Sequence, residues 1–106
     1  MTGASANDVY DFPIAHGEGK LINVPEELLA NGQVPFYYAD RDGKVRMSFD
    51  ANPNGSEYAV AALTDKTGRI FGIMAHPERA IPGLRADIPT EKNGQKIFDA
   101  GVKYWA

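Results

Sequence analysis

Cysteine is absent from this 106-residue sequence. Disulfides, thiolate metal sites and a cysteine nucleophile are therefore excluded within the chain. Basic residues are also few, since 11 Lys and Arg stand against 14 Asp and Glu, which gives a formal net charge of -3. That balance provides no electrostatic footprint for nucleic acid or for an anionic membrane, so we expect small-molecule or protein partners.

Long hydrophobic runs are missing as well. No stretch of about eighteen apolar residues occurs, and the N-terminal residues MTGASANDVYDF contain no basic segment followed by an apolar run. The sequence therefore predicts a cytoplasmic chain without a membrane or nucleic acid partner. Its length predicts one domain or part of one, and we expect a flexible leader over residues 1–11 before a domain over residues 12–106.

Two segments carry the patterns of helices. Residues 24–32, VPEELLANG, place a proline and two glutamates at the start and Asn-Gly at the end, which is typical of a short helix. The final residues, QKIFDAGVKYWA, place apolar side chains at helical spacing and predict an amphipathic helix. The side chains expected on its apolar face are Ile97, Phe98, Val102 and Trp105.

Other segments carry the patterns of strands. Residues 34–49 and residues 58–75 each hold two strand-like runs around a polar turn, so each segment predicts a hairpin. The four runs are 34–39, 44–49, 58–63 and 69–75. The second pair is almost continuously hydrophobic, which fits strands covered on both faces by helices. With a further strand in residues 11–20, which leads into a loop, the order of elements predicts a mixed α/β layer.

The sharpest local signal is His76-Pro77-Glu78, at the end of a hydrophobic run. A histidine acts as a general base near neutral pH, and a carboxylate that accepts a hydrogen bond from its other ring nitrogen stabilises the imidazolium. Pro77 stiffens the turn, so the two side chains can be held in that geometry. A surface or capping role stays open, because His-x-Glu is a common sequence.

A loop with two glycines, His16 to Gly19, is the second candidate. Glycines let backbone N–H groups approach a ligand closely, so this loop could bind a carboxylate or an oxyanion through main-chain donors. It is not a Walker A loop, because the required spacing before Lys20 and a following Ser or Thr are absent. The alternative is a tight turn with an exposed histidine.

The third candidate is the sequence NPNGS, residues 52–56, which has the composition of a rigid turn. The functional alternative is that its amides and the Ser56 hydroxyl hydrogen-bond a ligand or a neighbouring domain. The two histidines could also meet at a metal with Glu18 and Glu78, yet no His-x-x-x-His spacing supports such a site. We therefore predict no metal and no cofactor.

These motifs stand in an order that resembles a known family. PIAHGEGK, NPNGS, AALTDKTGRIFGIMAHPERA and IFDAGVKYW follow one another as in the C-terminal half of the glutaminase subunit or domain of phosphoribosylformylglycinamidine synthase, an enzyme of purine biosynthesis. The likeness runs from about Phe12 to Trp105. It implies part of a class I glutamine amidotransferase fold, a flavodoxin-like mixed α/β sheet with a C-terminal helix.

The resemblance also implies roles for particular residues. In that family a Cys-His-Glu triad hydrolyses glutamine, and the ammonia passes to a synthetase partner. His76 matches the base of the triad and Glu78 its orienting carboxylate, and HPER and NPNGS are candidate docking surface for the synthetase. The loop that holds the α-amino and carboxylate ends of glutamine corresponds here to His16, Gly17 and Glu18. The remaining substrate-side candidates are Asn54, Gly55 and Ser56.

One departure from the family changes the expectation. Its members carry the nucleophile in a Gly-Val-Cys-Asn-Gly-like stretch, and this sequence has neither that stretch nor a cysteine. Because the reaction starts with thiolate attack on glutamine, we interpret the chain as a fragment that does not hydrolyse glutamine alone. Its expected partners are glutamine, a synthetase subunit or a complementary N-terminal half, and further copies of itself in a homo-oligomer. The alternative is a non-catalytic binding or assembly module that retains the scaffold.

Overall fold

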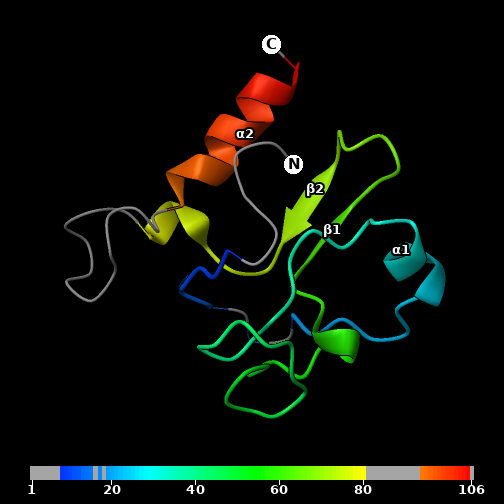
Figure 1. Cartoon of the computed structure of the whole chain (residues 1–106), viewed down its shortest axis with the longest axis vertical. Helices are drawn as coiled ribbons and strands as arrows, with labels where there is room; N and C mark the ends of the chain where they lie inside the picture. The colour runs from blue at the N-terminus through cyan, green and yellow to red at the C-terminus, as the bar shows by residue number, and fades with distance from the viewer. Residues whose placement is uncertain (1–7, 16, 18, 81–93, 106) are drawn as a thin grey trace. The chain divides into compact units, whose positions relative to one another are not determined.

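The computed structural model describes residues 8–15, 17, 19–80 and 94–105 (Figure 1). Its regular elements are helix α1 (Glu26–Ala30), strands β1 (Ala62–Thr64) and β2 (Phe71–Ile73), helix α2 (Gln95–Trp105) and two 3-10 turns, η1 (Glu57–Ala59) and η2 (Pro77–Arg79). Helices and strands both occur, as the α/β prediction requires. The chain divides into two compact units, one made of Met1–Ala15 with Ala75–Ala106 and the other of His16–Met74.

Helix α1 forms where the sequence predicts it. Pro25 precedes its first residue with φ of -63, and Glu26 and Glu27 lie in the first turn, where carboxylates are favoured by the helix dipole. At the other end Asn31 donates its N–H to the Glu27 carbonyl at 2.9 Å. Gly32 follows with φ of +70, a left-handed conformation that ends many helices. The predicted short helix is therefore confirmed.

Strands β1 and β2 form a two-stranded antiparallel sheet, in which Leu63 lies opposite Gly72. This confirms the hairpin predicted over residues 58–75, although its strands are shorter than expected. Strand β1 begins only at Ala62 because Tyr58 and Ala59 have φ of 52 and 56, a left-handed conformation that interrupts an extended chain.

The covering of the sheet differs from the prediction. In β2, Gly72 is exposed, and the side chains of Phe71 and Ile73 are only half-buried. The prediction of strands covered on both faces is therefore wrong for β2, because a sheet of two short strands offers little surface for helices to pack on. The described part of residues 11–20 also contains no strand, so that prediction is wrong there as well.

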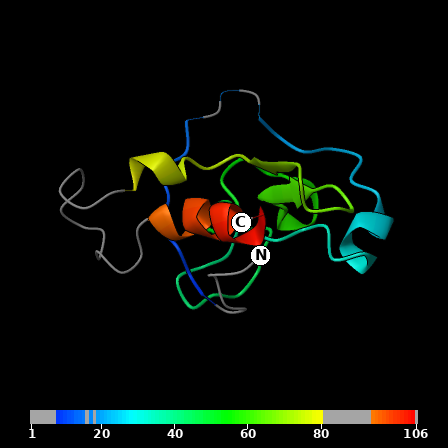
Figure 2. The ribbon, with the colours of Figure 1, turned by 90° about the horizontal axis from the view of Figure 1, so that it is seen from above.

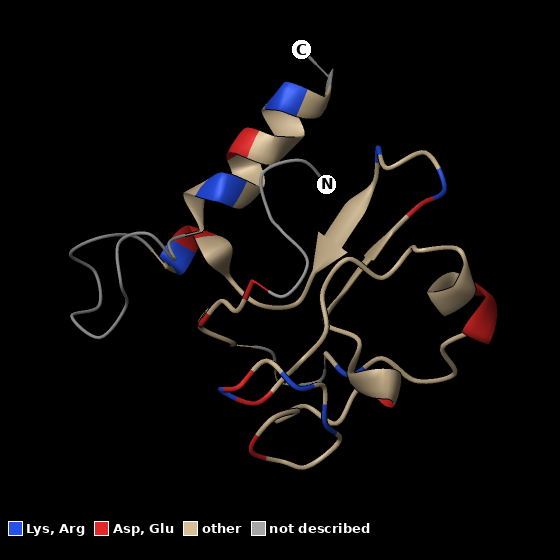
Figure 3. Cartoon of the chain, in the orientation of Figure 1, with Lys and Arg blue, Asp and Glu red and all other residues tan. Residues whose placement is uncertain are grey.

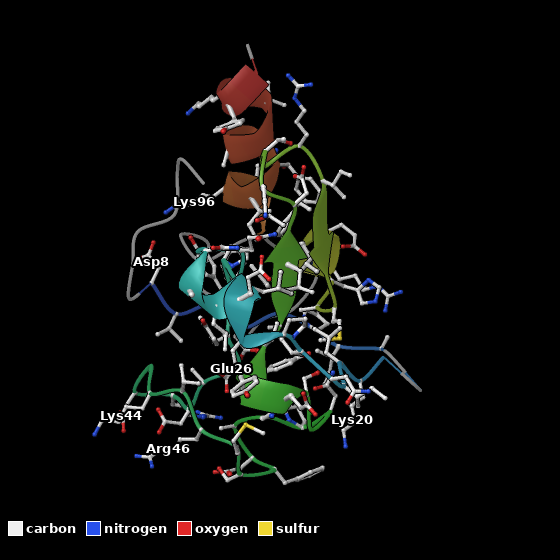
Figure 4. The ribbon with its side chains drawn as sticks, turned by 90° about the vertical axis from the view of Figure 1, so that its right-hand side faces the viewer. Asp8, Lys20, Glu26, Lys44, Arg46 and Lys96 are labelled. Atoms are coloured by element: carbon white, nitrogen blue, oxygen red, sulfur yellow. The ribbon has the colours of Figure 1, made fainter. Side chains whose placement is uncertain are left out.

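Residues 34–49 form the predicted turn but not the predicted strands. Asp40 closes the turn by accepting two backbone N–H groups. Arg46, which is labelled in Figure 4, donates its Nε to the same carboxylate at 2.6 Å. Pairing between the two runs is limited to an isolated bridge between Ala39 and Val45. All side chains from 41 to 50 are exposed, so the second run has no apolar surface to hold it as a strand.

A hydrophobic cluster lies in the unit His16–Met74. Val60 is fully buried, and Val24 and Val34 are each 8% exposed. The leucines packed against these valines are Leu21, Leu28, Leu29 and Leu63. Because two of the leucines belong to α1, burial of apolar surface stabilises a five-residue helix that would not persist in isolation.

Helix α2 confirms the helix predicted at the end of the chain, but its apolar face is only partly buried. Ile97 and Ala100, three positions apart, are 6% and 2% exposed, whereas Phe98 and Val102 are 47% and 71% exposed. The side chain of Trp105 lies outside the described residues. The spacing in the sequence therefore identified the helix correctly, but the predicted apolar face is wrong for Phe98 and Val102, because packing buries the side of Ile97 and Ala100 instead.

Charged residues of both signs are distributed over each unit (Figure 3). Lys66 and Glu27 form an ion pair at 3.8 Å in which both side chains are largely exposed, and pairs of this kind contribute little to stability. Among the helices that the structure describes, none has the length and hydrophobicity required to cross a membrane.

The turn between β1 and β2 is closed by Asp65. Its carboxylate accepts hydrogen bonds from the Thr67 hydroxyl at 2.6 Å and from the Ile70 backbone N–H at 3.0 Å. These bonds, the one from Thr67 first, lower the pKa of Asp65 from 3.8 to about 2, because they favour the ionised carboxylate.

We expect the folded chain to lose stability in acid through this carboxylate. A lowered pKa stabilises the fold above pH 3.8, and this contribution disappears as the pH falls toward about 2. Carbon NMR of the Asp65 carboxyl should give a midpoint near pH 2, and Asp65→Asn should weaken the pH dependence of unfolding. Asp42→Asn, in another exposed turn, serves as the control. A midpoint near 3.8 in the folded chain would contradict the expectation.

Candidate functional site

The turn that carries His76 follows β2 directly in the sequence. Pro77 is the first residue of η2, where a fixed φ and a missing N–H are tolerated. The backbone N–H groups of Arg79 and Ala80 donate to the carbonyls of His76 and Pro77 at 3.0 and 3.1 Å. The sequence His-Pro-Glu-Arg thus forms a tight 3-10 turn that leaves the side chains at positions 76 and 78 close together.

Backbone hydrogen bonds hold this turn at both ends. The N–H of His76 donates to the Pro13 carbonyl at 2.8 Å. The carbonyl of Ala80 accepts the N–H of Gly94 at 2.9 Å. Segments that are far apart in the sequence therefore meet at the turn, and all of them belong to the unit of Met1–Ala15 and Ala75–Ala106.

The side chains of His76 and Glu78 are in direct contact. Nδ1 of His76 lies 2.6 Å from Oε1 of Glu78, a short distance typical of a hydrogen bond to a charged group. With its proton on Nδ1, the histidine donates this bond, and Nε2 is then the basic nitrogen. The two side chains are 32% and 54% exposed, so a ligand in solution can reach them.

The electrostatics of the pair suit proton transfer. The hydrogen bond from His76 lowers the pKa of Glu78 below its ordinary value of 4.5, and the backbone N–H of Glu78 adds to the effect. The carboxylate is therefore ionised at neutral pH, as the orienting partner of a histidine general base has to be. The pair has the geometry of a general base with its orienting carboxylate, and its part in catalysis stays a prediction.

The loop His16 to Gly19 is described only at its two glycines. Gly17 is exposed, and a Cβ built on it would meet no atom within 4 Å. His16 and Glu18 lie outside the described residues, so their contacts with glutamine stay predictions. A metal site shared by both histidines would also need His16 and Glu18, which are not described. Among the described residues, no group of three His, Cys, Asp or Glu side chains could hold a metal ion.

The NPNGS sequence forms the turn that its composition predicts, and it is tied into the unit His16–Met74. Asn52 and Ser56 are 1% and 0% exposed, and Nδ2 of Asn52 donates to the Ser56 carbonyl at 2.9 Å. Gly55 has φ of +72, a conformation that glycine adopts without the cost of a Cβ. The turn is therefore specified by its own backbone and by a buried amide.

Three side chains form hydrogen bonds with the backbone of residues 19–24. Two of them, Asn54 and Ser56, belong to this turn, and the third belongs to Glu57, the residue after it. The bonds are Asn54 Nδ2 to the Gly19 carbonyl at 2.8 Å, Leu21 N–H to Ser56 Oγ at 3.1 Å, and Val24 N–H to Glu57 Oε2 at 2.9 Å. The Ser56 hydroxyl is thus engaged inside the chain, and ligand contacts of Asn54, Gly55 and Ser56 stay predictions. No local pattern points to Glu57, because its partner lies 33 residues earlier.

Comparison with known proteins places this chain in a family. A family model for the CobB/CobQ-like glutamine amidotransferase domain matches residues 2–105. The chain belongs to the CobB/CobQ-like glutamine amidotransferase family. Membership in this family agrees with the resemblance drawn from the four sequence motifs, and a role of the contact between His76 and Glu78 in glutamine hydrolysis stays a prediction.

Curated relatives of this amidotransferase chain carry the name phosphoribosylformylglycinamidine synthase subunit PurQ. The protein from Dehalococcoides mccartyi is 42% identical over 101 residues, which cover 90% of this chain and 39% of the relative. The protein from Methanothrix thermoacetophila is 35% identical over 106 residues, with 92% and 40% covered, and that from Aquifex aeolicus is 47% identical over 77 residues, with 69% and 33% covered. The chain therefore spans at most about two fifths of the length of these relatives.

Proposed function

We propose that this chain is part of a glutaminase component of phosphoribosylformylglycinamidine synthase and supplies the base and the orienting carboxylate of a Cys-His-Glu triad. The observation that carries the proposal is the 2.6 Å contact between His76 Nδ1 and Glu78 Oε1. The match to the amidotransferase family and the likeness to PurQ subunits support it. In this proposal the chain is the C-terminal half of a flavodoxin-like amidotransferase domain.

The proposed chemistry uses His76 twice as a proton carrier. Its Nε2 takes the thiol proton of a cysteine, and the thiolate attacks the amide carbon of glutamine. The histidine then gives that proton to the departing nitrogen, so ammonia leaves and a thioester remains. A water molecule, deprotonated by the same nitrogen, hydrolyses the thioester to glutamate. Glu78 keeps the imidazole oriented throughout and stabilises its positive charge.

The cysteine has to come from outside these 106 residues, since the sequence contains none. The proposed source is a complementary N-terminal half, in the same protein or in another chain. The proposed substrate contacts are those of the glycine-containing loop, through His16, Gly17 and Glu18. A synthetase subunit is the proposed recipient of the ammonia.

We expect the purified 106-residue chain to release no ammonia from glutamine above background. The base and its carboxylate are present, but acyl transfer needs a thiolate to accept the acyl group. A coupled ammonia assay measures this directly, with an intact PurQ relative in its active complex as the positive control. Cysteine-independent turnover by the 106-residue chain, unaffected by further purification, would contradict the proposal.

The competing function is a non-catalytic binding or assembly module. Large apolar side chains at the surface of the unit His16–Met74 favour it, with Ile22, Phe49 and Ile70 63%, 80% and 70% exposed. An NMR titration with glutamine separates the two functions. Shifts confined to Gly17 and His76 support a retained amidotransferase site. Self-association in sedimentation, without any response to glutamine, supports an assembly module.

A further inference from the structure

Gly94 lies at the start of α2 and packs against the turn that carries the candidate base. A Cβ built on Gly94 would overlap the carbonyl oxygen of Pro77. It would lie 2.5 Å from the carbonyl carbon of Pro77 and 2.7 Å from the Cα of Pro77. Cβ atoms essentially never approach another heavy atom within 3.0 Å. Because the atoms in the way belong to the backbone, a side chain at position 94 can be accommodated only if the turn or the helix moves.

The same glycine is bonded to the turn that it packs against. Its N–H donates to the Ala80 carbonyl at 2.9 Å, and its own carbonyl accepts the N–H of Ile97 at 3.2 Å as α2 begins. Figures 1 and 2 both show the first turn of α2, drawn in orange, beside η2, drawn in yellow. Gly94 thus joins η2 to a helix that is anchored by the buried side chain of Ile97.

The position of the Glu78 carboxylate depends on this backbone. Glu78 is the middle residue of η2, and its side chain is 54% exposed, so hydrogen bonds to His76 and to its own backbone N–H hold the carboxylate more than packing does. One end of the turn is held by the Pro13 carbonyl, and the other by Gly94. Because the backbone N–H of His76 is bonded to the Pro13 carbonyl at the other end, a shift of η2 at the Gly94 end would move Glu78 relative to the His76 ring.

We propose that Gly94 is a positioning residue for the pair of His76 and Glu78: its lack of a side chain and its bond to Ala80 set the turn that places the Glu78 carboxylate on His76 Nδ1. The positioning itself is a property of the chain as it stands. Its consequence for catalysis rests on the function proposed above. A misplacement of about 1 Å near a reacting group can cost roughly a hundredfold in rate, so the effect on an active complex is measurable.

The test on the chain alone compares Gly94→Ala with Gly101→Ala. Gly101 lies inside α2, and a Cβ built on it would meet no atom within 4 Å, so the two variants make the same chemical change with and without a steric conflict. In Gly94→Ala we expect the His76 Nδ1 resonance to lose the signature of its bond to Glu78 and the pKa of Glu78 to rise toward 4.5. In Gly101→Ala both should stay as in the wild type.

Carbon shifts of residues 95–105 report separately on the helix. Alanine favours a helix more than glycine does, so α2 should persist in both variants. Unchanged His76 and Glu78 signals in a folded Gly94→Ala variant would overturn the proposal. If that variant unfolds, a urea titration of the wild type replaces it. The protection of the Gly94 amide from hydrogen exchange and the bond between His76 and Glu78 should then be lost at the same urea concentration. A bond that survives after the Gly94 amide has lost its protection overturns the proposal.

An active complex, assembled with a cysteine-bearing N-terminal half, gives the catalytic readout. Gly94→Ala should lower kcat roughly tenfold to a hundredfold with little change in KM, because substrate contacts are untouched. Normal activity of His76→Ala in that complex would sink the proposed function and leave the NMR result on positioning intact. Loss of activity in His76→Ala with a normal kcat in Gly94→Ala would overturn the positioning role alone.

Discussion

Replacing His76 with alanine should lower glutamine hydrolysis by a factor of about 10² to 10⁴ in a complex of this chain with a cysteine-bearing N-terminal half. The variant loses the nitrogen that takes the thiol proton and returns it to the leaving ammonia. The measurement is kcat for ammonia release, and the N-terminal portion can be taken from the PurQ protein of Dehalococcoides mccartyi, which is 42% identical to this chain in the shared region.

Two companion variants make the result specific. Lys66→Ala removes an exposed charge from the turn between β1 and β2, so its kcat should stay within about twofold of the wild type. Glu78→Gln keeps the shape of the side chain but removes the charge that stabilises the imidazolium, so its kcat should also fall steeply. A complex in which His76→Ala hydrolyses glutamine at the wild-type rate would exclude this histidine as the base.

Replacing Ser56 with alanine should cost about 1 to 3 kcal/mol of unfolding free energy. Ser56 is 0% exposed, and its Oγ accepts the Leu21 N–H at 3.1 Å, so the variant leaves a backbone donor without its acceptor. Urea unfolding of the full chain measures the loss. Faster hydrogen exchange at the Leu21 amide should accompany it, because that N–H is the partner of the missing oxygen.

Ser48→Ala is the matched control for this prediction. It removes the same hydroxyl from an exposed residue, where the hydroxyl bonds the exposed Asp50, so its effect should stay within about 0.5 kcal/mol. Equal stabilities of the two variants would mean that the buried bond to Leu21 contributes nothing. In that case the tie between the NPNGS turn and residues 19–24 would have to depend on Asn54 and Glu57.

Local patterns predicted the parts of the fold that local forces specify. The proline, glutamates and Asn-Gly of residues 24–32 act within one or two turns of chain, and α1 formed between them. The turn at Asp65 to Gly68 formed for the same reason, since Gly68 supplies a φ of +72 and Asp65 bonds the residues that follow it. His76 directly precedes η2 and Glu78 is its middle residue, so two positions of spacing sufficed to predict that the two side chains can meet.

Predictions that depended on contacts between residues far apart in the sequence were less accurate. The run 44–49 has the residues of a strand, but a strand persists only when another strand or an apolar surface accepts it, and here its side chains are exposed. The left-handed backbone at Tyr58 and Ala59 shortened β1, although neither residue type signals that conformation. In α2, packing buried Ile97 but left Phe98 and Val102 at the surface, although these two are four positions apart as on one helix face.

The sequence by itself determined the amidotransferase motifs and their order, the two helices, the tight turns, and the pairing of a histidine with a carboxylate two residues later. The tertiary structure alone decided that Ser56 and Glu57 hold the backbone of residues 19–24, and that Gly94 lies against the turn of His76. The physical reason is range: a turn or a helix end is stabilised by neighbours in the chain. The hydroxyl of Ser56 and the absent Cβ of Gly94 matter only after folding has placed a backbone group from a distant part of the sequence against them.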